Sequence, residues 1–116
     1  TTSTIWRVRA GGVERLTLDP GELGIAPADP AALRGGDVAQ NVQVARDLFA
    51  GQRSPVRDAV VLNAAAGLAA YTGLSDDLSA DLAAGVQQAQ DALDSGAAAR
   101  VLERWTELGR ELTATG

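Results

Sequence analysis

The chain has 116 residues, of which 46% are hydrophobic and 22% are charged, proportions typical of one modest globular domain rather than a disordered segment. Its formal net charge is −5, it lacks cysteine and histidine, and its ten basic residues are all arginines scattered along the chain. This composition excludes disulfides, thiolate zinc sites and histidine general bases. Nucleic acid is not an expected partner, because nucleic-acid binding requires clustered positive charge.

The sequence also argues against a membrane segment and against a secretory signal. The longest apolar run, residues 59–71, is shorter than the roughly 20 residues that span a bilayer, and it contains Asn63. No basic segment precedes an apolar stretch near the N-terminus. We therefore expect no membrane contact and a cytoplasmic location. Because methionine is absent throughout, we also expect a processed chain or a part of a longer one.

Residues 3–18 are expected to form a β-hairpin. Two strand-like segments flank Gly11-Gly12, a pair suited to the positive φ angles of a tight hairpin turn. Both strands carry apolar residues on each face, and Trp6 is expected to pack in a core. Because an isolated hairpin is marginal in water, we expect further strands or helices around it, some of them missing from this chain.

Residues 19–36 are expected to form a linker, because proline and glycine interrupt any regular pattern there. One short helical turn is expected inside it, over Pro30–Arg34. Asp29 would cap this turn, and Pro30 would occupy its first helical position.

Four helices are expected after the linker, over about residues 37–50, 55–72, 76–94 and 96–113. Asp37 would cap the first helix, and Gly51 would close it. Ser75 and Ser95 would open the third and fourth helices, with acidic residues near both starts. The second helix is rich in alanine and is expected to be the most buried, with an apolar stripe of Val56, Val60, Ala64, Leu68 and Tyr71. The aromatic side chains of Phe49 and Trp105 are expected to pack in the core.

The loop Gly35-Gly36-Asp37 has two interpretations. Small residues before a helix let backbone N–H groups approach a phosphate, so the loop could belong to a nucleotide-type site. The alternative is a plain helix cap, in which the Asp37 carboxylate itself occupies the anion position at the helix start. A proline-rich linker rather than a strand precedes the loop, which favours the cap.

Three further groups of polar residues have a functional and a structural interpretation. Arg57 could clamp a carboxylate or phosphate, or it could tie the second helix to a loop. Asn63 could bond a substrate, or it could be a core amide satisfied by nearby backbone. Asp58 and the pair Asp76-Asp77 sit where a helix dipole favours acids, although two adjacent acids could also ligate a divalent metal. The structural interpretation is favoured for each.

The segment Leu33–Leu68 resembles the C-terminal part of the anthranilate phosphoribosyltransferase family. The resemblance continues in Ala92–Trp105 and in the hairpin, and it covers about residues 1–110. These motifs are specific to the family in their order and spacing. The absence of lysine and the abundance of alanine resemble the composition of actinobacterial members. The matching residues in the first segment are Gly35-Gly36-Asp37, Asn41, Arg46, Gly51, Pro55, Arg57-Asp58 and the run LNAAAGL at 62–68, and those in the second are Asp94, Ser95, Gly96, Ala97 and Leu102.

The resemblance implies a fold and an activity. The fold class is an α/β fragment, in which residues 1–116 form the C-terminal portion of the larger α/β domain of a phosphoribosyltransferase. The intact enzyme would transfer the phosphoribosyl group of phosphoribosyl pyrophosphate to anthranilate in tryptophan biosynthesis, using Mg²⁺. Family members are usually homodimers that associate through a separate, small helical domain.

The family's working parts do not map onto this sequence. Its glycine-rich pyrophosphate loop, its Lys-His-Gly-Asn stretch and its anthranilate-contacting arginine belong to earlier segments, and this chain has no lysine or histidine. The Mg²⁺ ligands are expected upstream of Thr1. No catalytic, substrate-binding or metal-ligating residue is therefore carried over. The chain alone is expected to be inactive, and its expected partner is the missing N-terminal part of the same enzyme.

The sequence leaves two other functions open. The chain could be a free-standing, non-catalytic helical interaction module, which would unfold cooperatively as a compact monomer or dimer. It could also be a segment of a related pyrimidine nucleoside phosphorylase, which shares parts of the same motifs. A fragment of a larger enzyme would instead expose apolar surface on the hairpin and on the alanine-rich helix.

Overall fold

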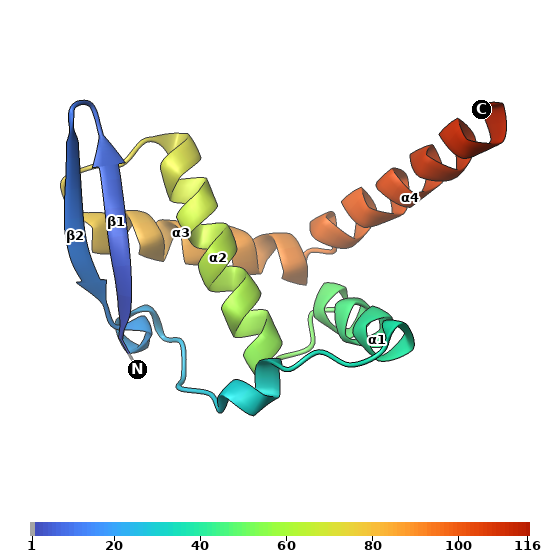
Figure 1. Ribbon diagram of the computed structural model, residues 1–116, viewed down its shortest axis with the longest axis horizontal. Helices are drawn as coiled ribbons and strands as arrows, with labels where there is room; N and C mark the ends of the chain where they lie inside the picture. The colour runs from blue at the N-terminus through green and yellow to red at the C-terminus, as the bar shows by residue number, and fades with distance from the viewer. Residues whose placement is uncertain (1) are drawn as a thin grey trace.

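The computed structural model describes residues 2–116, and it consists of a hairpin followed by four α-helices (Figure 1). This order confirms the fold expected from the sequence. Two short 3-10 turns, η1 and η2, lie between the hairpin and the first helix. The bounds are β1 Ser3–Arg9, β2 Gly12–Leu18, η1 Pro20–Leu23, η2 Pro30–Leu33, α1 Val38–Phe49, α2 Pro55–Thr72, α3 Leu78–Asp94 and α4 Ala97–Thr115.

The two strands pair antiparallel, with Ser3 opposite Leu18 and Arg9 opposite Gly12. The hairpin turn therefore consists of Ala10 and Gly11, one position earlier than expected, and only Gly11 of the two glycines has a positive φ, +82°. The inner face of the hairpin packs on the second half of α2 and the start of α3, with Leu18 buried against Ala69 and Leu82. The hairpin thus closes one end of the helix pair.

The linker contains two helical turns rather than one. The expected turn exists as η2, with Asp29 as its N-cap and Pro30 in its first position. The additional turn, η1, is built in the same way, because the Asp19 carboxylate accepts a hydrogen bond of 2.9 Å from the Gly21 N–H. Each Asp-Pro pair therefore starts a turn, and the sequence analysis did not predict the one at Asp19-Pro20.

Helices α2 and α3 form the centre of the molecule and pack closely against each other (Figure 1). They approach each other tightly at Gly85, where an added Cβ would lie 2.5 Å from the carbonyl oxygen of Ala65. The main cluster of buried residues surrounds this approach, and it consists of Leu48, Val61, Ala65, Val86, Ala89 and Leu93. A glycine in α3 thus sets the distance between the two central helices.

The prediction for the buried face of α2 is wrong, because the buried residues lie one position after the predicted ones. The buried residues are Arg57, Val61, Ala65 and Ala69, whereas Val60 is 40% and Tyr71 92% exposed. Nearly every position of α2 is apolar, so its periodicity does not identify one face. The expectation that α2 is the most buried helix is also wrong, because α3 buries five residues against four in α2.

The starts of the last two helices also differ from the expectation. Helix α3 is capped by Asp77, whose carboxylate accepts a hydrogen bond of 3.0 Å from the Ala80 N–H, and not by Ser75. Ser95 ends α3 instead of opening α4, which begins after Gly96 in a left-handed conformation. The first turn of α4 contains no acidic residue. The helix break therefore depends on a glycine rather than on a serine cap.

The tryptophans do not pack in the core. Trp6 is 63% exposed on the outer face of the hairpin, where Arg15 lies 5.8 Å from the centroid of its ring. Trp105 is 72% exposed on α4, which extends away from the other helices (Figure 1). Phe49 is partly buried against the main cluster, as expected. Among the helices described, none is long and apolar enough to cross a bilayer.

Candidate functional site

The loop Gly35-Gly36-Asp37 is fastened to the start of α1 by hydrogen bonds within the chain. Asp37 caps α1, and its carboxylate accepts a hydrogen bond of 2.8 Å from the Gln40 N–H. The Asn41 side chain accepts a bond of 3.0 Å from the Gly36 N–H and donates one of 3.1 Å to the Gly36 carbonyl. These contacts confirm that Asp37 caps α1, because its carboxylate accepts from an N–H of the first turn and occupies the helix start, where an anion would otherwise bind.

Arg57 is the most deeply buried charged residue of the described chain, with 1% of its surface exposed. Its Nη1 and Nη2 lie 2.8 and 2.9 Å from the two carboxylate oxygens of Asp94, and Nη1 also donates to the Gly51 carbonyl at 3.2 Å. This two-pronged pairing matches a planar guanidinium to a carboxylate. It ties the start of α2 to the end of α3 and to the loop after α1, as the structural interpretation of Arg57 predicts.

The environment of Asp94 favours its charged form. The hydrogen bond from Arg57 lowers the pKa of the Asp94 carboxyl below its ordinary value of 3.8, although partial desolvation opposes this shift. The Arg57 donors point toward Asp94 and Gly51, and no described polar side-chain atom that is buried lacks a partner. The group therefore acts as a structural clamp between Arg57, Asp94 and Gly51.

Asp58 and Asn63 have local roles. Asp58 lies in the first turn of α2, where the helix dipole favours an acid. Asn63 is exposed rather than in the core, and its side-chain amide donates a hydrogen bond of 2.8 Å to the Ala59 carbonyl of its own helix. The expectation of a backbone-satisfied amide is confirmed, while the expected core location is wrong.

A second buried arginine was missed in the sequence. Arg7 points from the inner face of β1, is 8% exposed, and contacts Glu14 at 2.6 Å. It also donates to the Ser75 carbonyl at 3.0 Å, while its neighbour on the same face, Arg9, pairs with Asp76 at 2.9 Å. The two arginines fasten the hairpin to the α2–α3 loop. The cross-strand register of Arg7 and Glu14 is the signal that could have revealed this cluster.

The acidic residues near the start of α3 do not suit a metal ion. Asp77 is the helix cap, Asp76 pairs with Arg9, and Asp81 accepts hydrogen bonds of 2.8 Å from both the N–H and the hydroxyl of Ser75. Within residues 2–116, no three acidic side chains are arranged to hold a cation. The described residues therefore do not fit Mg²⁺, and we assign no step to it here.

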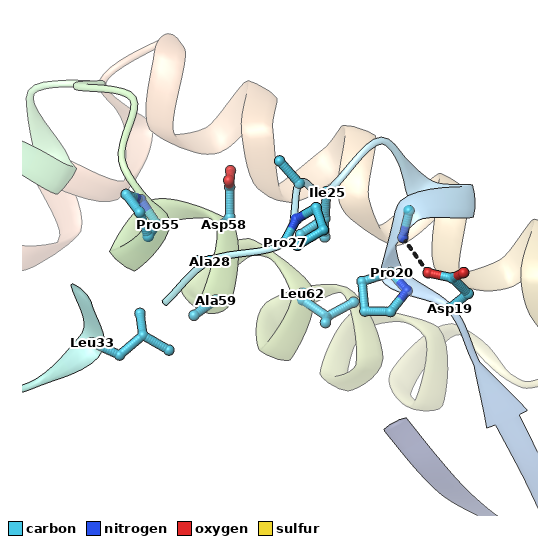
Figure 2. Close-up of a pocket in the computed structure, with 12 residues that line it drawn as sticks. Asp19, Pro20, Ile25, Pro27, Ala28, Leu33, Pro55, Asp58, Ala59 and Leu62 are labelled. Atoms are coloured by element: carbon cyan, nitrogen blue, oxygen red, sulfur yellow. Dashed lines mark hydrogen bonds between the residues drawn. The ribbon is translucent and has the colours of Figure 1, made fainter. Parts of the chain in front are cut away.

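A pocket of about 170 Å³ lies between the linker and the first half of α2 (Figure 2). Ile25, Leu33 and Leu62 contribute apolar walls, and its two charged residues, Asp19 and Asp58, are both acidic. A pocket that holds a substrate is usually larger, about 300 to 1,000 Å³. Because carboxylates repel phosphate and no cation lines the pocket, this surface is poorly suited to an anionic substrate.

Three structural clusters of polar groups stand out among the described residues, at the α1 cap, at Arg57 and at Arg7. Each joins elements that are distant in the chain or closes a helix end, and each satisfies its own hydrogen bonds. Chemically, these clusters hold the hairpin, α1 and the α2–α3 pair in fixed positions. They place no free cation beside the pocket.

Comparisons with known proteins show which family this chain is similar to. The glycosyl transferase family, a/b domain, matches residues 1–99. An anthranilate phosphoribosyltransferase from Nocardioides sp. is 54% identical over 105 residues, which cover 90% of this chain and 31% of that protein. A protein of the same name from Mycolicibacterium vanbaalenii is 52% identical over 114 residues, covering 97% and 31%. One from Thermobifida fusca is 51% identical over 107 residues, covering 92% and 31%. The chain therefore spans about a third of the length of these curated relatives.

Proposed function

The chain belongs to the glycosyl transferase family, a/b domain, and on that premise we propose that it is the C-terminal supporting portion of an anthranilate phosphoribosyltransferase. One observation carries the proposal. Almost the whole chain, 97%, aligns at 52% identity with an enzyme of that name, yet it accounts for only 31% of that enzyme. The described part of the chain then supplies packing surfaces, and the remainder of the enzyme supplies the chemistry.

In the proposed enzyme, a phosphoribosyl group passes from phosphoribosyl pyrophosphate to the nitrogen of anthranilate, and pyrophosphate leaves. Such a transfer depends on positioning the reactants and on neutralising the charge of the leaving group. The net charge of this chain is −5, and its two buried arginines are already paired with Asp94 and Glu14. We therefore assign substrate binding and the Mg²⁺ ligands to a part of the enzyme that precedes Thr1, and we expect the enzyme to be cytoplasmic.

The hairpin gives physical support to this role. Its inner face packs on α2 and α3, but Trp6, Val8 and Val13 are each more than 60% exposed on its outer face. Cross-strand pairing puts Val8 directly opposite Val13, so these side chains form one apolar patch. A patch of this kind marks an interaction site. We assign it to contact with the remainder of the enzyme.

A chimeric enzyme tests the proposal. The segment of the Mycolicibacterium vanbaalenii enzyme that aligns with this chain is replaced by this chain, and phosphoribosyl transfer to anthranilate is measured with phosphoribosyl pyrophosphate and Mg²⁺. We expect turnover by the chimera, and none by the isolated 116-residue chain or by the relative lacking the segment. Turnover by the isolated chain, or a folded chimera without activity, would contradict the proposal.

A further inference from the structure

Helix α4 carries an apolar face that no described residue covers. The helix buries no residue, and it extends away from the rest of the molecule after contacting the end of α3 (Figure 1). The face consists of Val101, Trp105, Leu108 and Leu112, which are 64, 72, 52 and 64% exposed. A helix that projects alone into water is marginal, because most helix stability in proteins comes from the packing of an apolar face. Residues 2–116 do not supply the surface on which this face would pack.

The shape of the face favours a cover broader than a single helix. At about 100° per residue, its four side chains lie within a sector of about 60°. Leu102 and Gly109 widen the uncharged sector on one side to about 120°. The other side is bordered by charged residues, Arg104, Glu107 and Glu111. A coiled-coil seam is narrower than this, whereas a sector of about 100° or more is typical of a helix that packs on a protein core.

Relatives of this chain share the helix. The family match ends at residue 99, two residues after α4 begins, but the match to the Mycolicibacterium vanbaalenii protein covers 97% of the chain and so includes most of α4. The matched 114 residues are 31% of that protein, so more than twice as many of its residues lie outside the match. A protein that contains α4 therefore also contains enough further chain to cover it.

A folded body of that size can reach both ends of the described molecule. About 250 residues form a domain with a radius of gyration of about 18 Å, which corresponds to a sphere about 46 Å across. The longest extent of the described chain is 47 Å, with the hairpin toward one end and α4 toward the other (Figure 1). One body can thus contact both the outer hairpin face and α4.

We propose that the apolar face of α4 packs against the part of the same polypeptide that precedes Thr1. The inference rests on the proposed function, which supplies that part of the enzyme. A second copy of the chain is a poorer occupant, because one partner helix would not cover the full width of the face. A contact within one polypeptide also has an effective concentration far above that of a separate molecule. The outer hairpin face and α4 then fix the orientation of this chain at its two ends.

Thiol protection in the chimera tests whether the face is buried, because this chain has no cysteine of its own. Val101→Cys and Leu112→Cys place a thiol in the face, while Glu103→Cys and Arg110→Cys place one on the exposed, polar side at a similar depth along the helix. Mass spectrometry of the peptide that carries each new cysteine gives its alkylation rate in the folded chimera and in urea. We expect the first two thiols to react at least about tenfold more slowly in the folded protein, because a buried thiol reacts only after local opening. The two control thiols should differ by less than about threefold.

Photo-cross-linking identifies the surface that covers the face. Trp105 of the chimera is replaced by the photoreactive residue p-benzoylphenylalanine, and the irradiated protein is separated by mass before its peptides are sequenced. We expect a product with the mass of one chain, in which an α4 peptide is joined to a peptide that precedes Thr1. Replacement of Glu103 by the same photoreactive residue is the matched control and should give no such product.

The two experiments separate the possible occupants of the face. Cross-links at the mass of two chains would assign the face to a second copy, and cross-links to residues 2–96 would mean that α4 folds back on its own segment. Either result would overturn the proposal. An active chimera whose Val101→Cys and Leu112→Cys thiols react as fast as the controls would refute the docking and leave the proposed function intact. A folded chimera with protected thiols but no turnover would refute the proposed function and leave the docking intact.

Discussion

Gly85→Ala should destabilise the chain, although alanine is the better helix former. The new Cβ would lie 2.5 Å from the Ala65 carbonyl oxygen and 2.9 Å from the Ala65 Cα, whereas ordinary contact begins at 3.4 Å. Because these atoms are backbone, α2 and α3 must separate by about 1 Å, which loosens the core around them. Overpacking of this kind costs about 3 kcal/mol. The higher helix propensity of alanine offsets about 1 kcal/mol of this cost, so the free energy of unfolding should fall by about 2 kcal/mol.

Gly67→Ala is the matched control within the same helix pair. Gly67 lies on the exposed side of α2, and an added Cβ would meet no atom within 4 Å. Only the higher helix propensity of alanine then affects stability, so this substitution should stabilise the chain by about 0.5 to 1 kcal/mol. Urea unfolding followed by circular dichroism measures both variants. Equal changes in the free energy of unfolding for Gly85→Ala and Gly67→Ala would refute the close approach of α2 and α3.

Three further substitutions test the Arg57 clamp, the α1 cap and the outer face of the hairpin. Asp94→Asn should destabilise the chain at neutral pH. Because the pKa of Asp94 is lowered in the folded state by the Arg57 hydrogen bond, the stabilising effect of the carboxylate is present above its unfolded pKa of about 3.8 and is lost as the pH falls through the folded value. The difference from the unaltered chain in a series of urea titrations should therefore shrink as the pH falls below that range, and a constant difference would contradict the pairing. Asp37→Ala removes the bond to the Gln40 N–H and should cost about 1 kcal/mol in the same assay, whereas no loss would mean that water replaces the cap. Trp6→Thr should change the stability of the isolated chain by less than about 0.5 kcal/mol, since the side chain is 63% exposed, but it should lower the activity of the chimera. Unchanged activity would exclude the outer hairpin face as a contact.

The sequence was sufficient for the features that depend on local chemistry. Asp29 and Asp37 each precede a helical segment, and their side chains cap it, because a short polar side chain bonds the first free N–H groups regardless of what surrounds the helix. Gly51 closes α1 with a φ of +85°, as a glycine after a helix is expected to do. These features need no knowledge of the tertiary fold.

The predictions that were wrong concern features that depend on contacts between elements. The buried side of α2 is decided by the Arg57 clamp and by the approach of Gly85 to Ala65, and neither is visible in a helix that is apolar all round. The orientation of the hairpin is likewise decided by Arg7, whose hydrogen bonds to the α2–α3 loop turn its face inward and leave Trp6 outside. Burial of an arginine contradicts a simple hydrophobic pattern, and it is possible because the charge is paired.

The central claim is that this chain supports a phosphoribosyltransferase whose substrate and metal ligands lie elsewhere in the same polypeptide. The most direct measurement is to read the coding sequence that precedes Thr1 in the source genome. We expect an open reading frame that encodes the family's Mg²⁺ ligands, an Asp-Glu pair, shortly before the stretch Thr1-Thr2-Ser3-Thr4. A Lys-His-Gly-Asn stretch and a glycine-rich loop should lie further upstream. A start codon immediately before Thr1 would contradict the claim and would favour a free-standing interaction module.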